Sequence, residues 1–337
     1  MSVTIYDIAR EAGVSIATVS RVFNNSNSVS EKSRNKILSI ANDLGYHPKA
    51  MAQGLARKKS KLISAIVPVI SNYFFMEVLE GIQDFMSKSD YDLNIYNIKP
   101  SGDIFNQVEH IIKRGMSEGY LIISVHLTDK EWHSLKKLNV NITLIDDYSA
   151  EFDSVSVDSV EGAYQATKHL VKSGYERIAM VTASQITKPT HDRITGYKRA
   201  LEEDGRIVDD GLIVTGDSRD RDGFTEQNGY EAMMKLLSLD HLPDACFCNS
   251  DIQAIGALKA MQDIGVVIPI VGFDDIEVSD FFSLSTMRQP MKEMGFMAIE
   301  KLMNRIENKD AEVSRTVFSP ELILRNTTEE VYTPGKP

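Results

Sequence analysis

The sequence has little cysteine and no long apolar run. Its only thiols are Cys246 and Cys248, which stand in the apolar run ACFC. A metal or redox site would need further cysteine or histidine ligands beside them, so we expect buried structural cysteines. No apolar run reaches the ~18 residues that would suggest a membrane span. The N-terminal string MSVTIYDIAREAGVS carries acids and lacks the apolar stretch of a secretory signal, so we expect a cytoplasmic protein.

The familiar sequence signatures of catalysis are also missing. The chain has no phosphate-binding loop of the GxxxxGK[ST] type, no HExxH zinc motif and no nucleophile elbow. The acidic pairs Asp146–Asp147 and Asp274–Asp275 are adjacent in the chain, so their side chains diverge on a strand. The sequence therefore predicts neither an enzyme nor a metal or cofactor protein.

Charge is abundant but unevenly distributed. The whole chain has a net charge of −11, which by itself argues against a nucleic-acid partner. Residues 1–60, however, hold nine Lys or Arg and four Asp or Glu, a net of +5, so the remainder carries −16. Because attraction to phosphates is screened beyond about 8–10 Å, a compact basic segment on an acidic body can still bind DNA. The length suggests two or three domains.

Residues 4–45 have the pattern of three short helices, at 4–12, 15–23 and 30–45. Each begins at a hydroxyl side chain suited to N-capping and carries an apolar stripe at helical spacing. Two short helices joined by a tight turn at Gly13 and supported by a third form a helix-turn-helix. The residues expected to face inward are Ile5, Ile8, Ala9, Val19, Val22, Phe23, Ile37, Ile40, Ala41 and Leu44.

Residues 49–60 differ in composition from the segments on either side. The string KAMAQGLARKKS is compatible with a helix but has few residues that could form a core. Such a segment cannot bury itself alone, so we expect a hinge that folds only when DNA is bound. A linker that is disordered at all times is the alternative.

From residue 61 onward, short β-branched runs alternate with amphipathic stretches of about 12 residues. Repeated strand–helix–strand units favour parallel sheets with right-handed crossovers, and about ten strands fit two such sheets better than one. Ligands of these sheets bind beyond the carboxyl ends of the strands, which between two lobes is the interlobe cleft. The expected strands are LISAIVPV, YDLNIYNI, YLIIS, ITLID, SVSVD, RIAMVTA, LIVTG, DACFCNS, PIVGFDD and STMRQ.

A set of longer strings follows in a fixed order down almost the whole chain. They are TIYDIAREAGVSIATVSRVFN, HPKAMAQGLAR, SNYFFMEVLEGI, VSVDSVEGAYQATKHLVKSGYERIAMVT, RITGY, NSDIQAIGAL, VGFDD, MRQPMKEMG and ELILRNT. In order and spacing they closely resemble the LacI (lactose-repressor, GalR-type) family of bacterial transcription regulators. The resemblance implies an N-terminal all-α helix-turn-helix domain and a two-lobed α/β domain like that of periplasmic binding proteins. It also implies a homodimer that binds a palindromic operator as a repressor and is switched by a small effector, a sugar or sugar phosphate.

The resemblance also implies domain boundaries. The helix-turn-helix domain would span 1–48, the hinge 49–60, the effector-binding and dimerisation domain 61–330 and the tail 331–337. Within the large domain, lobe 1 would comprise about 61–158 and 290–318. Lobe 2 would comprise about 159–289 and 319–330.

By this resemblance, the start of the second helix enters the major groove of DNA, where each base pair shows a distinct pattern of donors and acceptors. Ile16 and Ala17 form the implied specificity pair, and as apolar residues they can contact thymine methyl groups only. Thr18 and Arg21 would supply polar recognition. The alternative interpretation is purely structural: Thr4 and Ser15 would serve as helix caps without contacting DNA, and the Tyr6 ring would pack against the protein. Donors suited to phosphate oxygens are Thr4, Tyr6, Ser15, Ser20 and Asn24.

In the hinge, Leu55 matches the family's apolar wedge, which enters the minor groove at the centre of a palindromic site. Ala52 lies one turn away and is small enough to approach the groove floor. Gln53 stands where the family usually has arginine, so hinge affinity would depend on Arg57, Lys58 and Lys59. A leucine buried within a linker helix is the alternative interpretation of Leu55.

We predict that Leu55→Ala lowers operator affinity at least ~tenfold and reduces DNA bending, because wedge insertion accompanies the unstacking of a base step. A gel-shift or anisotropy titration measures the change. Unchanged binding would rule out the wedge assignment.

Neutral polyols are held by convergent carboxylates, bidentate donors and an aromatic face, and the family pocket positions carry these residue types. Arg193 with Asp274 is the strongest pair, since a guanidinium fork beside a carboxylate can grip adjacent hydroxyls. Asp251 could instead cap a helix, and Asp146 could hold an interlobe salt bridge. The expected effector contacts are Asn72, Phe74, Asp146, Arg193, Phe224, Ser250, Asp251, Asp274 and Met291.

Other interpretations remain open at this point. The Ile16–Ala17 pair also resembles the carbon-catabolite branch of the family, in which a protein corepressor controls some regulators. A cytoplasmic sugar-binding module without a switch, or an architectural DNA protein without an effector, would show no effector-dependent DNA binding.

Overall fold

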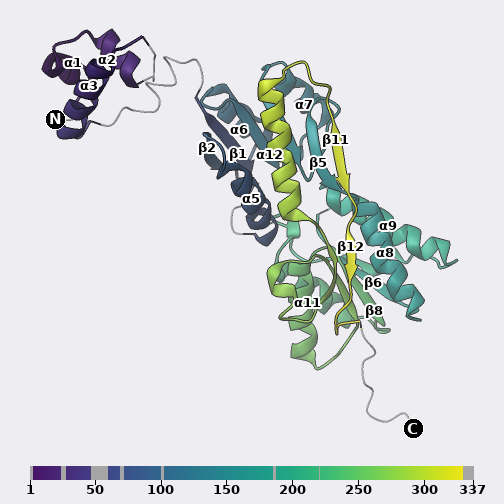
Figure 1. Cartoon of the computed structure of the whole chain (residues 1–337). Coiled ribbons are helices and arrows are strands. Elements are labelled where there is room, and N and C mark those ends of the chain that lie inside the picture. The colour runs from purple at the N-terminus through teal and green to yellow at the C-terminus, as the bar shows by residue number, and fades with distance from the viewer. Residues whose placement is uncertain are drawn as a thin grey trace. The chain divides into compact units, whose positions relative to one another are not determined.

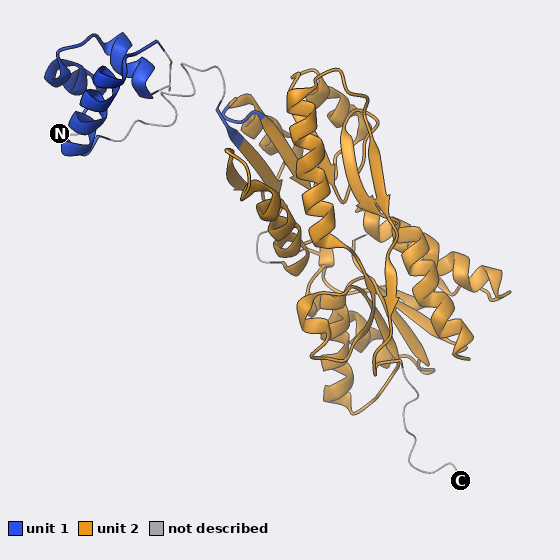
Figure 2. Ribbon diagram, in the orientation of Figure 1, with its two compact units in different colours: residues 1–62, 116–118 blue, residues 63–115, 119–337 orange. Residues whose placement is uncertain are grey.

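The computed structural model describes residues 3–23, 28–46, 60–68, 72–99, 102–184, 187–219 and 221–328. The chain divides into two compact units, residues 1–62 with 116–118 and residues 63–115 with 119–337, which Figure 2 shows in blue and orange. The expected contacts Asn24, Ala52, Leu55 and Arg57 lie outside the described residues.

The first unit contains the helices α1 (Ile5–Ala12), α2 (Ile16–Phe23) and α3 (Glu31–Asp43). The Asp7 carboxylate accepts hydrogen bonds from the backbone N–H (3.0 Å) and the hydroxyl (2.7 Å) of Thr4. Ser15 and Ser30 accept from backbone N–H groups in the first turns of α2 and α3. Gly13 has a φ of 66°, a conformation that costs glycine no steric strain. The three predicted helices and their caps are confirmed.

The core of the first unit follows the predicted stripes with one exception. Every other predicted inward residue is either buried or packed against the buried cluster. The prediction for Leu44 was wrong, since 41% of this side chain is exposed. Helix α3 ends at Asp43, so Leu44 no longer continues the inward stripe. Tyr46 packs there instead, with its ring centroid 5.5 Å from that of Phe23.

The described residues of the second unit form two six-stranded sheets, with strand orders β11-β5-β4-β3-β1-β2 and β12-β10-β9-β8-β6-β7. The first consists of β1 (Leu62–Val67), β2 (Asp92–Asn97), β3 (Gly119–Ile123), β4 (Asn141–Ile145), β5 (Asp153–Val157) and β11 (Arg315–Phe318). The second consists of β6 (Ile178–Thr182), β7 (Ile213–Thr215), β8 (Ala245–Cys248), β9 (Ile270–Asp274), β10 (Ser285–Arg288) and β12 (Glu321–Ile323). Two sheets and the ten predicted strands are confirmed, and β11 and β12 each add one edge strand.

Most neighbouring strands are parallel, as the alternating pattern predicted. Pairs such as β1–β3, β3–β4, β6–β8 and β8–β9 run parallel, whereas β12 joins β10 antiparallel. We call the first sheet with its helices lobe 1 and the second sheet with its helices lobe 2. The chain passes between the lobes after β5, β10 and β11, as can be followed in Figure 1.

Helices cover the sheets of both lobes (Figure 1). Those of lobe 1 are α5 (Tyr73–Met86), α6 (Ile104–Lys113), α7 (Asp129–Lys136) and α12 (Met291–Glu307). Those of lobe 2 are α8 (Ser159–Lys172), α9 (Lys188–Glu203), α10 (Glu226–Leu237) and α11 (Asp251–Ile264), with short 3-10 segments η1 (Asp210–Leu212), η2 (Arg221–Gly223) and η3 (Glu277–Ser279). Within the described residues, no helix is both long and apolar enough to cross a membrane.

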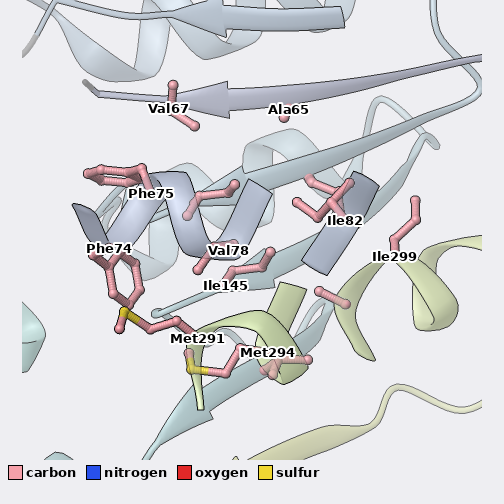
Figure 3. Packing of buried hydrophobic residues seen from close by; sticks show 14 of the residues in the cluster. Ala65, Val67, Phe74, Phe75, Val78, Ile82, Ile145, Met291, Met294 and Ile299 are labelled. Atoms are coloured by element: carbon pink, nitrogen blue, oxygen red, sulfur yellow. The ribbon is translucent and has the colours of Figure 1, made fainter. Parts of the chain in front are cut away.

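Helices α5 and α12 approach each other closely in the core of lobe 1 (Figure 3). A Cβ atom on Gly81 would lie 1.9 Å from the carbonyl oxygen of Lys292. One on Gly295 would lie 2.0 Å from the carbonyl oxygen of Val78. The two backbones are therefore in direct contact, which only glycine permits. This packing fixes the start of α5, which faces the site described below.

The two cysteines lie on β8 in the apolar core of lobe 2, and both side chains are fully buried. The prediction of buried structural cysteines is confirmed. Across the described part of the chain, no group of three or more His, Cys, Asp or Glu side chains is placed to hold a metal ion.

Candidate effector cleft and DNA-recognition surface

A cleft lies between the two lobes, at the carboxyl ends of the strands, and encloses about 810 Å³ that is partly open to solvent. Lobe 1 contributes the start of α5 and residues that follow β3 and β4. Lobe 2 contributes the starts of α9 and α11, the η2 segment and the end of β9. Both lobes therefore touch any molecule bound there, as expected for sheets of this type.

Arg193 and Asp274 are the central charged pair of the cleft. A guanidinium nitrogen of Arg193 lies 3.7 Å from a carboxylate oxygen of Asp274. Another nitrogen donates to the carbonyl oxygen of Asn249, and the guanidinium stacks on Phe273 at 3.7 Å from the ring centroid. The side-chain amide nitrogen of Gln289 donates to the same carboxylate oxygen of Asp274 at 2.6 Å. These contacts hold the fork and the carboxylate in fixed positions toward the cleft.

The backbone is strained where the carboxylates enter the cleft. Asp274 has a φ of 124° and Asp146 a φ of 62°, both in regions that residues with a side chain seldom occupy. Such backbone strain persists only where the surrounding structure enforces it, and strained residues are common at ligand-binding sites. The strained positions are therefore consistent with a binding role for both carboxylates.

Burial shifts the protonation of the charged groups in the cleft. It raises the pKa of Asp274 to about 8, although Arg193 acts in the opposite direction. Burial also raises the pKa of Asp146, despite a hydrogen bond from the Ser124 hydroxyl at 2.7 Å. Burial lowers the pKa of Arg193, even with carboxylates nearby. Burial thus disfavours the charged forms of Asp274, Asp146 and Arg193.

The raised pKa of Asp274 predicts a pH-dependent stability. The folded chain keeps a proton on Asp274 at pH values where the unfolded chain, with an ordinary carboxyl pKa of about 4, has lost it. The free energy of unfolding therefore falls as pH rises from about 4 to about 8. Between about pH 5 and about pH 8, we expect the free energy of unfolding of Asp274→Asn to fall by about 1–3 kcal/mol less than that of the parent chain. Urea denaturation at each pH measures the difference. The exposed Asp240→Asn is the control, and equal pH slopes for Asp274→Asn and the parent chain would refute the assignment.

The structure brings seven of the nine predicted effector residues to the cleft. They are Asn72, Phe74, Asp146, Arg193, Phe224, Ser250 and Asp274. The two others lie elsewhere. Asp251 is fully buried beneath the cleft and accepts hydrogen bonds from Ser279 (2.6 Å) and Thr286 (2.5 Å). Met291 is the first residue of α12 and belongs to the apolar core that Figure 3 shows.

The structure shows which hydrogen bonds Asp251 and Asp146 form, the two residues for which helix capping and an interlobe salt bridge were the alternatives. Ser250, not Asp251, is the N-cap of α11, with its hydroxyl oxygen accepting from the N–H of Gln253. Asp251 instead ties α11 to the backbone N–H of Ile276 at 3.1 Å. Asp146 forms a hydrogen bond to Ser124 within lobe 1. The buried carboxylate of Asp251 thus supports the wall of the cleft from behind.

Several residues of the cleft were not predicted from the sequence. Ser124 and His126 follow β3, and Gln289 follows β10, so the rule that strand ends carry the site could have found all three. Asp222 lies in η2, far from any strand end in the sequence pattern, and had no comparable signal. His126 lies 3.2 Å from Asp147. Burial lowers the pKa of His126, but this hydrogen bond and the nearby carboxylates outweigh it, so the pKa is raised.

Some buried polar atoms around the cleft have no hydrogen-bond partner within the protein. Among the described residues these include Nε of Arg193, Oε1 of Gln289 and Oδ1 of Asn249. A buried polar atom without a partner costs about 1–3 kcal/mol. Donors and acceptors of a bound molecule, or water, would remove that cost. The unpaired atoms of Arg193 and Gln289 stand beside Asp274 and so mark the centre of the candidate site.

The lobes also touch outside the cleft, through Tyr148. Its ring lies 4.6 Å from the ammonium of Lys188 in lobe 2 and 3.9 Å from the guanidinium of Arg315 in lobe 1. Cation–π contacts of this kind contribute about 0.5–2 kcal/mol each. Tyr148 therefore links the two lobes by a cation–π contact outside the cleft.

The first unit presents an exposed face on α2. Val19 and Val22 are buried, whereas Ile16, Ala17 and Arg21 are exposed on the other side of the helix. The Ser15 and Thr18 hydroxyl oxygens lie 2.9 Å apart at its start. Tyr6 on α1 is 67% exposed, so it does not pack into the core. Thr4 is also exposed, whereas Ser20 is half-buried.

Two basic side chains of α3 hold the first two helices in place. Arg34 donates to the carbonyl oxygen of Val22 at 3.3 Å, and Lys36 donates to that of Ala12 at 3.0 Å. Cations near the last carbonyl groups of a helix stabilise its end. The angle of α2, and with it the direction of Ile16, Ala17 and Arg21, is therefore set by charged contacts as well as by the apolar core.

A helix-turn-helix with an exposed second helix, followed by a two-lobed α/β unit with a polar cleft, defines the class of ligand-sensing DNA-binding regulators. The family model for bacterial regulatory proteins of the lacI family matches residues 4–49, and that for a periplasmic binding protein-like domain matches 167–328. Catabolite control protein A of Priestia megaterium is 35% identical over 339 residues, which cover 98% of this chain and 100% of the relative. The chain belongs to the LacI family of bacterial transcription regulators.

Two solved structures show the same architecture. A lac repressor dimer bound to operator and the anti-inducer ONPF has a TM-score of 0.82 at 24% identity, covering 97% of this chain and 99% of that chain. The transcriptional regulator CelR in complex with cellobiose has a TM-score of 0.72 at 25% identity, covering 96% and 99%. The predicted family and fold class are confirmed. The chain is a transcription regulator like its relatives, not an enzyme.

Proposed function

We propose that the chain binds a palindromic operator as a homodimer, represses transcription from it, and is switched by a small polyhydroxyl effector in the interlobe cleft. The observation that carries this proposal is the Arg193–Asp274 pair, with unpaired buried polar atoms of Arg193 and Gln289 beside it. A guanidinium fork and a carboxylate can together hold adjacent hydroxyl groups. The CelR structure, which holds cellobiose, supports a sugar as the effector class.

The exposed face of α2 supports the DNA-binding part of the proposal. Ile16 and Ala17 would contact thymine methyl groups, and Arg21 would donate to a guanine, the commonest specific contact of arginine. Tyr6 and Ser15 would contact phosphate oxygens, which fix register without selecting a sequence. DNA of the bacterial chromosome is the partner, and we therefore place the protein in the cytoplasm.

Exposed apolar side chains on the second unit support a homodimer. On lobe 1, Met76 of α5 is 52% exposed and Phe296 of α12 is 39% exposed. On lobe 2, a groove is lined by Tyr230, Ile255, Leu258 and the 48% exposed Phe282. Apolar patches of this kind mark interaction surfaces. A second copy of the chain is the proposed partner, because the similar lac repressor is a dimer.

Switching requires that the effector bind one arrangement of the lobes better than the other. The lining of the cleft supports such a switch, because it comes from both lobes. Closing the lobes on a ligand would move surfaces of both lobes within the dimer. The spacing of the two DNA-binding units, and so the fit to two half-sites, would change with it.

The proposal is tested by capturing genomic fragments on the full-length protein, followed by sequencing and effector titration. We expect the captured fragments to share one palindromic motif and a sugar panel to contain a compound that changes their binding. A motif without any sugar response would instead support control by a protein corepressor, or an architectural role. Fragments without a common motif would contradict sequence-specific regulation.

A further inference from the structure

Tyr148 contacts one cation from each lobe. The residue lies in lobe 1 shortly after the cleft residue Asp146, and it is 40% exposed. Its ring centroid lies 4.6 Å from the ammonium of Lys188 and 3.9 Å from the guanidinium of Arg315. Lys188 is the first residue of α9 in lobe 2, whereas Arg315 is the first residue of β11 in lobe 1. The contact with Lys188 therefore joins the lobes, and the contact with Arg315 stays within lobe 1.

Both partners of the interlobe contact are tied to residues that line the cleft. In lobe 1, the backbone N–H of Tyr148 donates to one carboxylate oxygen of Asp147 at 2.7 Å. The other oxygen of Asp147 lies 3.2 Å from Nδ1 of His126, which lines the cleft. In lobe 2, Lys188 directly precedes Pro189, which lines the cleft from the first turn of α9. A displacement of the cleft lining in either lobe thus reaches the contact through an immediate neighbour.

Opposite charges from the two lobes also attract each other across the cleft. Burial raises the pKa of Asp146 of lobe 1, and the positive charge of Arg193 of lobe 2 acts in the opposite direction. Burial likewise raises the pKa of Asp222 of lobe 2, and His126 of lobe 1 acts in the opposite direction. Each pair attracts when both of its members are charged. The charges of the cleft therefore favour the same close approach of the lobes as the cation–π contact.

We propose that Tyr148 and Lys188 form a latch whose strength sets the balance between this arrangement of the lobes and a more open one. A contact across the lobe boundary is lost when the lobes separate, so it stabilises only the closer arrangement. A cation–π contact at an exposed site shifts such a balance about two- to fivefold. The ion pair of Lys188 with Asp192, at 2.8 Å, lies within α9 and does not depend on the lobe arrangement.

The latch deepens the proposed function and rests on it, because a shift between lobe arrangements alters operator binding only if the lobes act as the switch. Within that function, Tyr148 and Lys188 are positioning residues, since neither lines the cleft. They would act on the effector through the distance between the two walls that hold it.

The test is a double-mutant cycle on the full-length protein, with the distance between the lobes as the readout. Spin labels are placed at Lys130→Cys on α7 of lobe 1 and Lys172→Cys on α8 of lobe 2, which are exposed positions, whereas the native cysteines are fully buried. We expect Lys188→Met and Tyr148→Leu each to lower the ratio of closer to open lobes about two- to fivefold. The double variant should lower it no further than either single change. An unchanged ratio in both single variants would overturn the inference.

Two matched variants separate the latch from a general loss of packing around the ring. Arg315→Met removes the other cation of Tyr148, within lobe 1, and should leave the ratio of lobe arrangements unchanged. Lys188→Arg keeps a cation beside the ring and should retain the ratio of the parent chain. A shift in Arg315→Met as large as that in Lys188→Met would show that packing of the ring, not the interlobe contact, sets the ratio.

Operator titrations distinguish failure of the latch from failure of the proposed function. The parent chain and Lys188→Met are titrated with operator, with and without each sugar of a panel that includes D-glucose, D-ribose and cellobiose. An unchanged lobe ratio in Lys188→Met, together with a sugar response in the parent chain, would overturn the latch and leave the proposed function standing. A shifted lobe ratio, together with no response to any sugar, would support the latch and contradict the proposed function.

Discussion

Asp274→Asn is expected to lower effector affinity about a hundredfold while operator affinity in the absence of effector stays within about threefold. The variant keeps the shape of the side chain and can still accept from Gln289. At a pH above about 8, where the carboxyl group of the parent chain is ionised, the substitution removes the charge that binds hydroxyl groups. Hydrogen bonds to a charged group contribute about 1.5–3 kcal/mol each, so losing the charge at two hydroxyl contacts accounts for the expected effect. Calorimetry with the sugar that binds the parent chain gives the affinity directly.

Asp275→Asn is the matched control, because it changes the neighbouring carboxylate. The Asp275 side chain does not line the cleft and instead binds Arg288 at 2.7 Å and Arg325 at 2.8 Å. Its loss should lower stability and leave effector affinity close to that of the parent chain. If both variants lose effector affinity equally, the assignment of Asp274 as the effector contact is wrong.

Arg21→Ala is expected to lower affinity for the operator by about ten- to a hundredfold and to relax the sequence preference at one base pair of each half-site. A good bidentate contact between arginine and guanine contributes about 1–3 kcal/mol of discrimination. Arg21 lies on the exposed face of α2, with Val19 and Val22 buried behind it, so the substitution should not disturb the fold. Anisotropy titrations on the captured operator and on single-base variants measure both effects.

Lys32→Ala is the matched control for charge. Lys32 is exposed near the start of α3 and is not part of α2, so its loss is expected to remove one positive charge without removing a base contact. We expect a small loss of affinity that is the same for all sequences, as for a phosphate contact or a long-range charge. Equal and sequence-independent losses in both variants would show that Arg21 contacts only the DNA backbone.

The first unit was the most predictable part of the fold, because its information is local. Helix caps and apolar stripes act within a few residues of the chain. All three helices therefore begin where the capping residues Thr4, Ser15 and Ser30 predicted. The prediction for Leu44 was wrong because α3 ends at Asp43, a residue or two earlier than the sequence pattern indicated. Such an error turns a side chain from the core to solvent, since each residue rotates the helix by about 100°.

The effector cleft was only partly predictable, because it is assembled from segments far apart in the chain. Strand ends marked Asp146 and Asp274, and a motif marked Arg193. Asp251 was misplaced because a carboxylate beside the cleft can face either a ligand or the hydroxyl groups of Ser279 and Thr286, and only the packing of η3 and β10 against α11 decides. The position of Asp222 in the cleft depends on a short segment whose residues have positive φ. No periodic pattern of apolar residues in the sequence predicts such a segment.

Operator affinity measured with and without bound effector tests the central claim most directly. A labelled operator from the genomic capture is titrated with full-length protein, first alone and then with a saturating concentration of a sugar whose binding has been established by calorimetry. We expect a change in operator affinity of at least about tenfold in the parent chain and none in Asp274→Asn at the same sugar concentration. A sugar that occupies the cleft of the parent chain and leaves operator affinity unchanged would contradict it.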